Sequence, residues 1–568
     1  MRKKIILIVF IIAILIVSIL KQALVYDLPI RANVGLGIDD MLMIYITDNI
    51  ANGKWVGEYN DVILSKGLSF PLILVLCYYL HVDYITMMTL LYTFACLYLT
   101  FVLSKKIKNK IILFFIYTLV LFTPIMYSYQ VMQRVYRNAI VPSLSIFIIA
   151  AYLNLFFTRN EGISKKRIAT VIGMGVVFAI FWYTREDSIW ILPYVIFISG
   201  AIIISKLVKD KKITKELFVT ILILIIPFVM TFIYKNILSY INYKHFGVYT
   251  VYNNEQYNKA MDSLRKVKKY DYYDNIDFTI AKLKKVSEVT CLKNIYGRLE
   301  GLVYGYSLFD SSPLDGEVAN GWFPWAFRGA MQEYGYYQNA EATNNFLYTL
   351  HVQIEDALEN GTLEKEDIKP SITERLKKIL YETGNVFKFL YAYNDIEFLD
   401  DKVEYNQSEE YKYSLYEKYT KNKFLVYNLE NNEYVYYSDI IDDYKDKITP
   451  KIELVKRIMS MYKVISAILF TVGCLLYLIL TIITIIHFIK KKFEILEIWV
   501  MSSGILGAML SLVFGIAYET AFNANVITAM YLSAVYPLMI IFGSIIIGYS
   551  IMKIIEYLKS KKVKVLPA

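Results

Sequence analysis

The stretch IILIVFIIAILIVSILKQAL, residues 5–24, follows the basic start Met1-Arg2-Lys3-Lys4. An apolar run of this length is long enough to cross the roughly 30 Å hydrocarbon core of a bilayer as a helix. A basic start is also typical of signal peptides, but this run exceeds an ordinary h-region and no small-x-small cleavage site follows it. We therefore interpret it as a retained membrane anchor, the first span of the chain.

Further apolar runs of similar length continue along the chain. Of its 568 residues, 56% are hydrophobic and only 20% are charged, which disfavours a soluble multidomain protein. The sequence predicts an α-helical polytopic membrane protein with about ten transmembrane helices. After the first, they are expected near residues 84–103, 111–127, 139–157, 168–183, 189–205, 216–238, 463–487, 496–516 and 527–552.

The charges between these runs predict the orientation. The segments RKK, SKKIKNK, TRNEGISKKR, KLVKDKKITK, KKK and KIIEYLKSKKVK lie on one side and are all basic, whereas the short loops of the other side hold few Lys or Arg residues. The positive-inside rule then places both termini on the cytoplasmic side of the membrane. The bias towards Lys, Ile, Asn and Tyr indicates that this is a bacterial plasma membrane. The net charge of +10 is explained by these basic residues, which are expected to face anionic membrane lipids. No nucleic-acid partner is required to explain it.

This topology divides the chain into three parts. Residues 1–238 form an N-terminal transmembrane module of about seven helices, with a first outer loop at 25–83. Residues 239–460 form a large, mostly helical extracytoplasmic domain, and residues 461–568 form a C-terminal module of about three helices. Of the four cysteines only Cys291 lies in the outer domain, so disulfides do not hold that domain together.

The first outer loop contains paired carboxylates, Asp39 and Asp40, in GLGIDDMLMIYITDNIANGKWVGEYN, residues 35–60. Asp39 is expected to cap a short helix that ends at Gly53 and lies on the membrane surface, before a second short apolar helix at SFPLILVLCYYL. Capping and the helix dipole are one explanation of the pair. A catalytic role is the other, because adjacent carboxylates at a lipid boundary repel each other and lose hydration, which raises a pKa towards the range of a general base.

An anchor, an Asp-Asp pair in the first outer loop, surface helices and a second span ending in a basic turn together resemble the GT-C superfamily of polytopic glycosyltransferases. The resemblance covers roughly the first 110 residues. It implies transfer of a sugar, with inversion, from a polyprenyl-phosphate carrier to a glycan, lipid or protein acceptor on the outer face, in cell-surface glycan modification or assembly. It also implies that Asp40, with Asp39 beside it, is the catalytic base. The second aspartate is expected to stabilise an oxocarbenium-like transition state or to bind Mg²⁺ or Mn²⁺, although no further metal ligands are identifiable.

A leaving phosphate needs cations, and three outer connections offer them. SYQVMQRVYRNAIVP contains Arg134 and Arg137, which their spacing of three places on one face of a helix. YTREDSIW contributes Arg185, and NDVILSKGLSFP contributes Lys66. The arginine fork suits phosphate, but interfacial residues that reach lipid headgroups are the alternative for each.

The short TRED turn also contains two acids, Glu186 and Asp187. Charges between two apolar spans must be paired or face a cavity. An ion pair within the turn is the simpler interpretation, and a second catalytic acid is the other.

The outer domain contains aromatic residues beside charge in SSPLDGEVANGWFPWAFRGAMQEYGYY. Trp322, Trp325 and Arg328 are candidates for sugar or acceptor contact, or for packing in the core or at the membrane interface. His245, just after the seventh span, is a further candidate, with ordinary packing as the alternative. The outer turn YETAFNAN contains Glu519, Asn523 and Asn525, which are candidates to line the same outer site.

Two other classes of function remain open. One is a transporter or flippase for a lipid-linked glycan, but the predicted spans are almost free of charge near their middle and show no paired repeat. The other is a non-enzymatic cell-envelope assembly factor. The sequence contains no Walker loop, HExxH or GxSxG motif, which disfavours nucleotide-driven pumps and the common membrane hydrolases.

Overall fold

The computed structural model describes residues 2–35, 37–162, 164–269, 276–308, 316–366, 371–398, 409–428, 433–436, 442–490 and 495–564. Within these residues, eight helices are long and apolar enough to cross a membrane. The predicted α-helical multi-span architecture is therefore confirmed. The eight belong to α1 (Arg2–Val25), α4 (Tyr84–Leu103), α6 (Val141–Phe157), α8 (Leu192–Asp210), α9 (Lys215–Phe246), α17 (Asp442–Ile489), α18 (Leu496–Phe522) and α19 (Val535–Lys564).

Two of the ten predicted runs form helices that do not meet this description. The run at 111–127 gives α5 (Lys110–Leu121), which has 12 residues, and a short 3₁₀ turn, η1 (Pro124–Met126). The run at 168–183 gives α7 (Lys165–Trp182), which starts with the basic sequence KKR. Both still belong to the bundle, because α5 packs against α1, α4 and α19 while α7 packs against α6 and α9.

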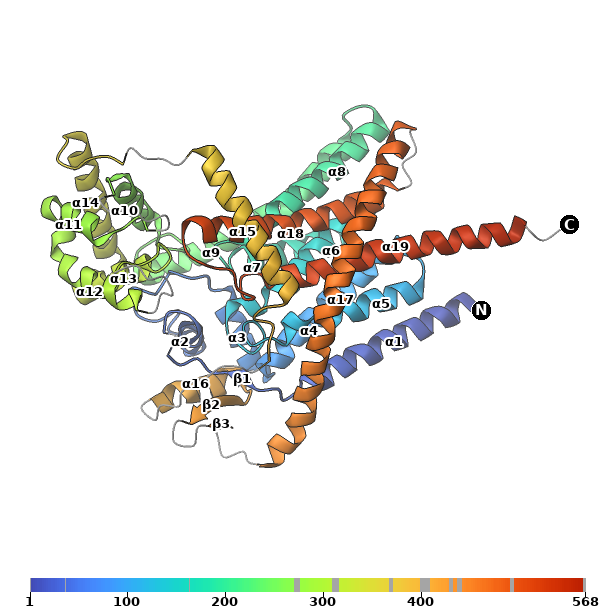
Figure 1. Cartoon of the computed structure of the whole chain (residues 1–568), viewed down its shortest axis with the longest axis horizontal. Helices are drawn as coiled ribbons and strands as arrows, with labels where there is room; N and C mark the ends of the chain where they lie inside the picture. Colours follow the sequence, from blue (N-terminus) through green and yellow to red (C-terminus); the bar gives the residue numbers. More distant parts are fainter. Residues whose placement is uncertain are drawn as a thin grey trace.

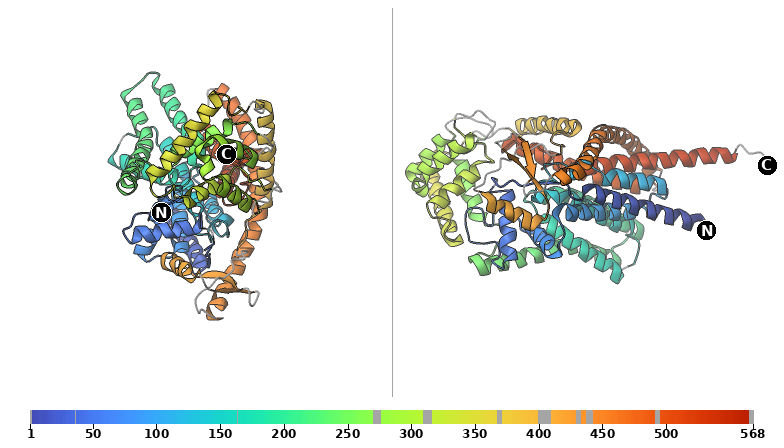
Figure 2. Two further views of the ribbon diagram at one scale, coloured as in Figure 1. Left: turned by 90° about the vertical axis from the view of Figure 1, so that its left-hand side faces the viewer. Right: turned by 90° about the horizontal axis from the view of Figure 1, so that it is seen from below.

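The molecule is elongated, and its two ends differ. Figures 1 and 2 show the N- and C-termini close to one end of the bundle and a group of short helices, α10 to α14, at the opposite end. These helices are α10 (Glu255–Lys266), α11 (Ile280–Val289), α12 (Tyr296–Ser307), α13 (Phe323–Glu333) and α14 (Ala340–Glu359). We call the end of the bundle next to them the domain end.

The region predicted as one outer domain, 239–460, has two parts in the structure. Helices α10 to α14 enclose an apolar core of their own, with Phe278, Phe323 and Leu350 among its buried residues. By contrast, α15 (Ile372–Ala392), α16 (Glu410–Thr420) and the start of α17 contribute Val386, Tyr416 and other side chains to the core of the bundle. The predicted boundaries at 238 and 460 fall inside the continuous helices α9 and α17.

The first outer loop forms the two predicted short helices, α2 (Asp40–Ala51) and α3 (Ser69–Leu80). The expectation that α2 lies on the membrane surface is wrong. Its apolar residues Met41, Leu42, Ile44 and Ile46 are each at most 2% exposed, because α3 and α16 pack against it. The apolar positions that suggested a lipid-facing helix instead face protein.

A small sheet fixes the chain just before α2. Strand β1 (Ile30–Arg31) pairs in parallel with β2 (Phe424–Asn428), which pairs antiparallel with β3 (Glu433–Tyr436). On its other side, Arg31 forms a parallel bridge with Arg134, and its backbone N–H donates to the Gln133 carbonyl at 2.8 Å. The segment that leads into the Asp pair is therefore attached to the connection that contains Arg134.

Helices α17 and α19 meet at a point where both have glycine. A Cβ added at Gly543 would collide with the Leu469 carbonyl, and one at Gly473 would lie 2.7 Å from the Gly543 Cα. We expect Gly543→Val to lower the free energy of unfolding by about 1–3 kcal/mol, because the two helices must move apart to make room for the side chain. Thermal melting of the detergent-solubilised protein, followed by size-exclusion chromatography, measures this. The control is Gly515→Ala on α18, where nothing lies within 4 Å of the new Cβ. Equal melting temperatures for Gly543→Val and wild type would contradict the close approach.

Candidate active site

Asp40 lies at the first position of α2 and is fully buried. Both of its oxygens accept from Arg134: Nε lies 2.9 Å from Oδ1 and 2.8 Å from Oδ2, and Nη2 lies 2.5 Å from Oδ2. Burial raises the pKa of the Asp40 carboxyl more than the Arg134 guanidinium lowers it, so the net shift is upward. The start of the helix also favours a carboxylate, since the unpaired N–H groups there carry partial positive charge. Asp40 is thus a buried anion held by one bidentate partner.

Asp39 occupies the predicted N-cap position, but its side chain makes no capping hydrogen bond. It contacts cations instead: Lys66 Nζ forms an ion pair with Oδ1, and Arg134 Nη2 lies 3.2 Å from Oδ2. The side chain is 29% exposed, whereas that of Asp40 is 0% exposed. Burial raises the pKa of Asp39, but Lys66 and Arg134 outweigh burial and hold the pKa at about 2. Asp39 is therefore an ionised carboxylate that solvent can reach.

Tyr136 lies at the centre of the cations. Its hydroxyl donates to Asp39 Oδ1 at 3.1 Å and accepts from Lys66 Nζ at 3.0 Å and from Arg137 Nε at 3.1 Å. The Arg134 Cζ lies 4.7 Å from the centre of its ring. One phenol thus brings the predicted Lys66, Arg134 and Arg137 together.

Arg134 and Arg137 do not share one face of a helix, as their spacing suggested. Arg134 lies in the β-bridge with Arg31, and Arg137 begins a single 3₁₀ turn, η2 (Arg137–Ala139). The cause is Tyr136, whose extended backbone (φ −144°, ψ 157°) interrupts any helix between them. The two arginines converge through that extended residue rather than through helical periodicity.

The TRED turn contains the predicted ion pair, and a second pair connects it to the cluster. Arg185 Nε donates to Asp187 Oδ1 at 2.8 Å, and Arg137 Nη1 lies 2.7 Å from Glu186 Oε1. The two carboxylates have side chains that are 40% and 43% exposed, respectively. Burial raises the pKa of Glu186, but Arg137 outweighs it, and the net shift is downward. Each arginine therefore has a partly exposed carboxylate as its partner.

The connection between α18 and α19, residues 523–534, contacts the cluster from the other side. The Met530 sulfur accepts from Arg134 Nη1 at 2.9 Å, and the Met530 carbonyl accepts from Asn138 Nδ2 at 2.8 Å. The ring of Tyr531 has its centre 4.9 Å from the Arg185 Cζ. The C-terminal helices thus hold the guanidinium groups in place.

The outer residues predicted to contact sugar have separate positions. Trp325, on α13, has its ring centre 5.3 Å from Lys66 Nζ and so borders the cluster. The others lie elsewhere. Trp322 stacks on Tyr306 with ring centres 5.9 Å apart, Arg328 donates to the Asp61 carbonyl at 3.0 Å and to Asn254 Oδ1 at 2.7 Å, and His245 stacks on Trp55 at 6.2 Å. These three side chains pack and cross-link the protein.

Sequence reasoning missed four members of the cluster: Tyr136, Arg31, Met530 and Tyr531. Tyr136 was present in the quoted basic segment, but nothing distinguishes it among 51 tyrosines. Burial lowers the pKa of Arg31 to about 10, and Asp40 and Arg134 both act on it electrostatically. Met530 and Tyr531 lie nearly 400 residues from Arg134 along the chain, so no local pattern could reveal them.

The carboxylates do not form a resident divalent-metal site. No group of three or more His, Cys, Asp or Glu side chains that could hold a metal ion occurs among the described residues. Asp40 and Asp39 already have Arg134 and Lys66 as partners, whereas Mg²⁺ and Mn²⁺ require several oxygen ligands free of competing cations. The two carboxylates are therefore surrounded as partners of arginine and lysine rather than as ligands of a metal ion.

Comparison with known proteins gives one structural likeness. The chain matches no protein-family model and no curated protein. Among solved structures it is similar to ArnT from Cupriavidus metallidurans bound to undecaprenyl phosphate, with 9% identity, 91% of this chain and 77% of that chain covered, and a TM-score of 0.30. A TM-score this low does not establish a shared fold.

We expect Arg134→Gln to destabilise the protein far more than Arg137→Gln. The first substitution leaves the fully buried Asp40 without its cation, which typically costs about 3–5 kcal/mol, whereas the second leaves Glu186 at a position that water reaches. Thermal melting of both variants at neutral pH measures the difference. Equal melting temperatures would show that Asp40 is not maintained as a buried anion.

The stabilising contribution of Asp39 should depend on pH. Its folded pKa of about 2 lies below the usual 3.8, so its ion pairs stabilise the fold fully above about pH 5 and are lost as the pH falls towards 2. The melting temperature of wild type should therefore exceed that of Asp39→Asn at pH 7. The difference between the two melting temperatures should narrow progressively between pH 5 and pH 3. A difference that is constant across this range would contradict the ionised state.

Proposed function

We propose that this protein is a GT-C-like glycosyltransferase that moves a sugar from a polyprenyl-phosphate carrier to an acceptor at the domain end of its membrane bundle. The observation that carries this proposal is the convergence of the Asp39–Asp40 pair with Lys66, Arg134 and Arg137. The aspartates and Lys66 come from the first outer loop and the two arginines from the connection between α5 and α6, both on the side predicted to face outward. The proposed setting is cell-surface glycan modification or assembly in a bacterium, with both termini cytoplasmic.

The two aspartates are suited to different tasks. Arg134 occupies both oxygens of Asp40, and no part of the Asp40 side chain is exposed. Asp39 is the more accessible carboxylate and is ionised at neutral pH. We therefore assign Asp39 as the base that accepts the proton of the acceptor hydroxyl, and Asp40 as the anion that positions Arg134.

The cations explain how a phosphate would bind. Lys66 is paired with Asp39, and Arg137 with the exposed Glu186. An incoming phosphate would take over these cations, because charge-assisted bonds from lysine and arginine suit its oxygens. Release of Lys66 from Asp39 would remove the largest of the interactions that lower the pKa of this carboxylate. Phosphate binding would therefore activate the base directly beside it.

The chemical step follows from these roles. The acceptor oxygen attacks the anomeric carbon from the face opposite the phosphate, its proton passes to Asp39, and the bond to the phosphate oxygen breaks. Polyprenyl phosphate leaves as an anion held by Lys66 and Arg137, the two cations whose carboxylate partners it replaces. Positive charge that develops at the anomeric carbon is stabilised by the remaining negative charge of the carboxylates.

The test is release of polyprenyl phosphate by the purified full-length protein, supplied with a panel of polyprenyl-phosphate sugars. We expect Asp39→Asn to lower the rate by about 10²- to 10⁴-fold, the usual contribution of a positioned base. Asp262→Asn is the matched control. Asp262 is 68% exposed and lies on α10, a helix that packs in the separate outer core. Its rate should equal that of wild type.

Other outcomes discriminate between the candidate functions. A loss confined to Asp40→Asn would move the base to Asp40. Equal rates in wild type and both aspartate variants would exclude the pair from catalysis. If wild type consumes no donor but moves the lipid-linked sugar across reconstituted vesicles, the protein is a transporter instead.

A further inference from the structure

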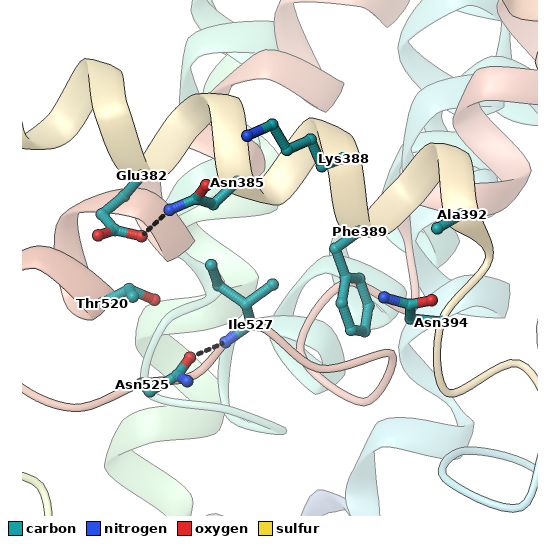
Figure 3. Close-up of a pocket in the computed structure, with 9 residues that line it drawn as sticks. All are labelled: Glu382, Asn385, Lys388, Phe389, Ala392, Asn394, Thr520, Asn525 and Ile527. Carbon is teal, nitrogen blue, oxygen red and sulfur yellow. Dashed lines mark hydrogen bonds between the residues drawn. The ribbon is translucent and has the colours of Figure 1, made fainter. Parts of the chain in front are cut away.

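A cavity of about 630 Å³ is lined in part by the connection 523–534, which also contacts the candidate active site. One wall is the C-terminal half of α15, and the other is the end of α18 with the connection 523–534 (Figure 3). Its volume falls within the range of small-molecule sites in proteins. The residues that line it are Glu382, Asn385, Lys388, Phe389, Ala392, Asn394, Thr520, Asn525 and Ile527.

The lining combines amides with one aromatic ring. Figure 3 shows Phe389 pointing from α15 towards the connection, with Asn394 beside it and Asn525 on the opposite wall. Asn525 Oδ1 accepts from the backbone N–H of Ile527 at 3.2 Å, which engages only the oxygen of that amide and leaves its two N–H donors for a ligand. An amide offers donors and an acceptor side by side, and a ring beside polar groups suits a ligand with one apolar face.

The balance of charge in the cavity disfavours a phosphate ligand. Its charged groups are Glu382 and Lys388, one of each sign, so it has no excess of cations to select a phosphate. This distinguishes it from the neighbouring cluster, where Lys66, Arg134 and Arg137 meet. A neutral polyhydroxylated molecule fits best, because its hydroxyls pair with amides and its C–H face covers an aromatic ring.

The connection 523–534 is shared by the cavity and the cluster. Asn525 and Ile527 line the cavity, whereas Met530 contacts Arg134 and Tyr531 contacts Arg185. Three residues of extended chain span at most about 11 Å, so Ile527 lies within that distance of the Met530 backbone. The cavity and the cations thus contact positions of the same short connection that are three residues apart along the chain.

We propose that this cavity binds carbohydrate of the acceptor and presents it to the carboxylates of the cluster. This inference rests on the proposed glycosyltransferase function and names its acceptor class as a glycan. Asn385, Phe389 and Asn525 are its recognition residues, and none of them takes part in proton transfer or phosphate binding.

The first experiment measures binding without turnover. Saturation-transfer NMR uses the full-length protein and linear oligosaccharides of three to five glucose, galactose or N-acetylglucosamine units. Wild type and Asn345→Ala should bind at least one of these probes, and the double variant Asn385→Ala/Asn525→Ala should lose at least tenfold in affinity. Asn345 is an exposed asparagine on α14, outside the cavity. Asp39→Asn should bind like wild type.

The second experiment separates this inference from the proposed function. Release of polyprenyl phosphate is measured with and without the bound probe. We expect the oligosaccharide probe to raise the rate of polyprenyl phosphate release by wild type. The double variant should need at least a tenfold higher probe concentration for the same rise. Its rate without probe, where water is the acceptor, should equal that of wild type. Stimulation that is identical in wild type and double variant, or probes that bind neither, would overturn the cavity assignment alone. Absence of release from wild type under all conditions would overturn both proposals.

Discussion

The buried ion pair between Asp40 and Arg134 is the constraint on which the rest of this site depends. Two charges removed from water are tolerated only if their geometry is nearly ideal and their remaining hydrogen-bonding groups are satisfied. The fold meets that condition from three directions: α2 places Asp40, the β1 bridge places the backbone of Arg134, and Met530 accepts from the free side of the guanidinium. The small sheet and the connection 523–534 are therefore as necessary to the site as the aspartates.

The cluster as a whole is a set of cations that already have anionic partners. Asp40 holds Arg134, Asp39 holds Lys66, and the solvent-exposed Glu186 holds Arg137. Such a cluster is stable without ligand, yet two of its three pairs are open enough for an incoming phosphate to replace the carboxylate. The third pair is buried and does not exchange. This division explains why two adjacent aspartates in one sequence motif differ in exposure, pKa and proposed task.

The sequence was sufficient for the features that depend on local composition. Runs of apolar residues predicted the helical bundle, and charges at the ends of spans predicted that Lys66, Arg134 and Asp40 would lie on one side of it. It could not predict which charges pair, because the paired charges are 27 to 95 residues apart and are brought together by Tyr136 and the sheet. For the same reason α2 resembled a lipid-facing helix: α16, which covers it, lies more than 350 residues further along the chain.

The connection 523–534 shows how separate parts of the protein act on one site. The Asp395 carboxylate accepts from the Ala529 backbone, which ties the end of α15 to the connection, and Asn320 of the outer core donates to the Phe522 carbonyl at 3.1 Å. Met530, one residue after Ala529, touches Arg134. The connection that forms one wall of the cavity is therefore the same short segment that contacts the buried arginine. Helix α15 and the outer core are both attached to it, so this segment joins the membrane bundle, the outer core and the cation cluster.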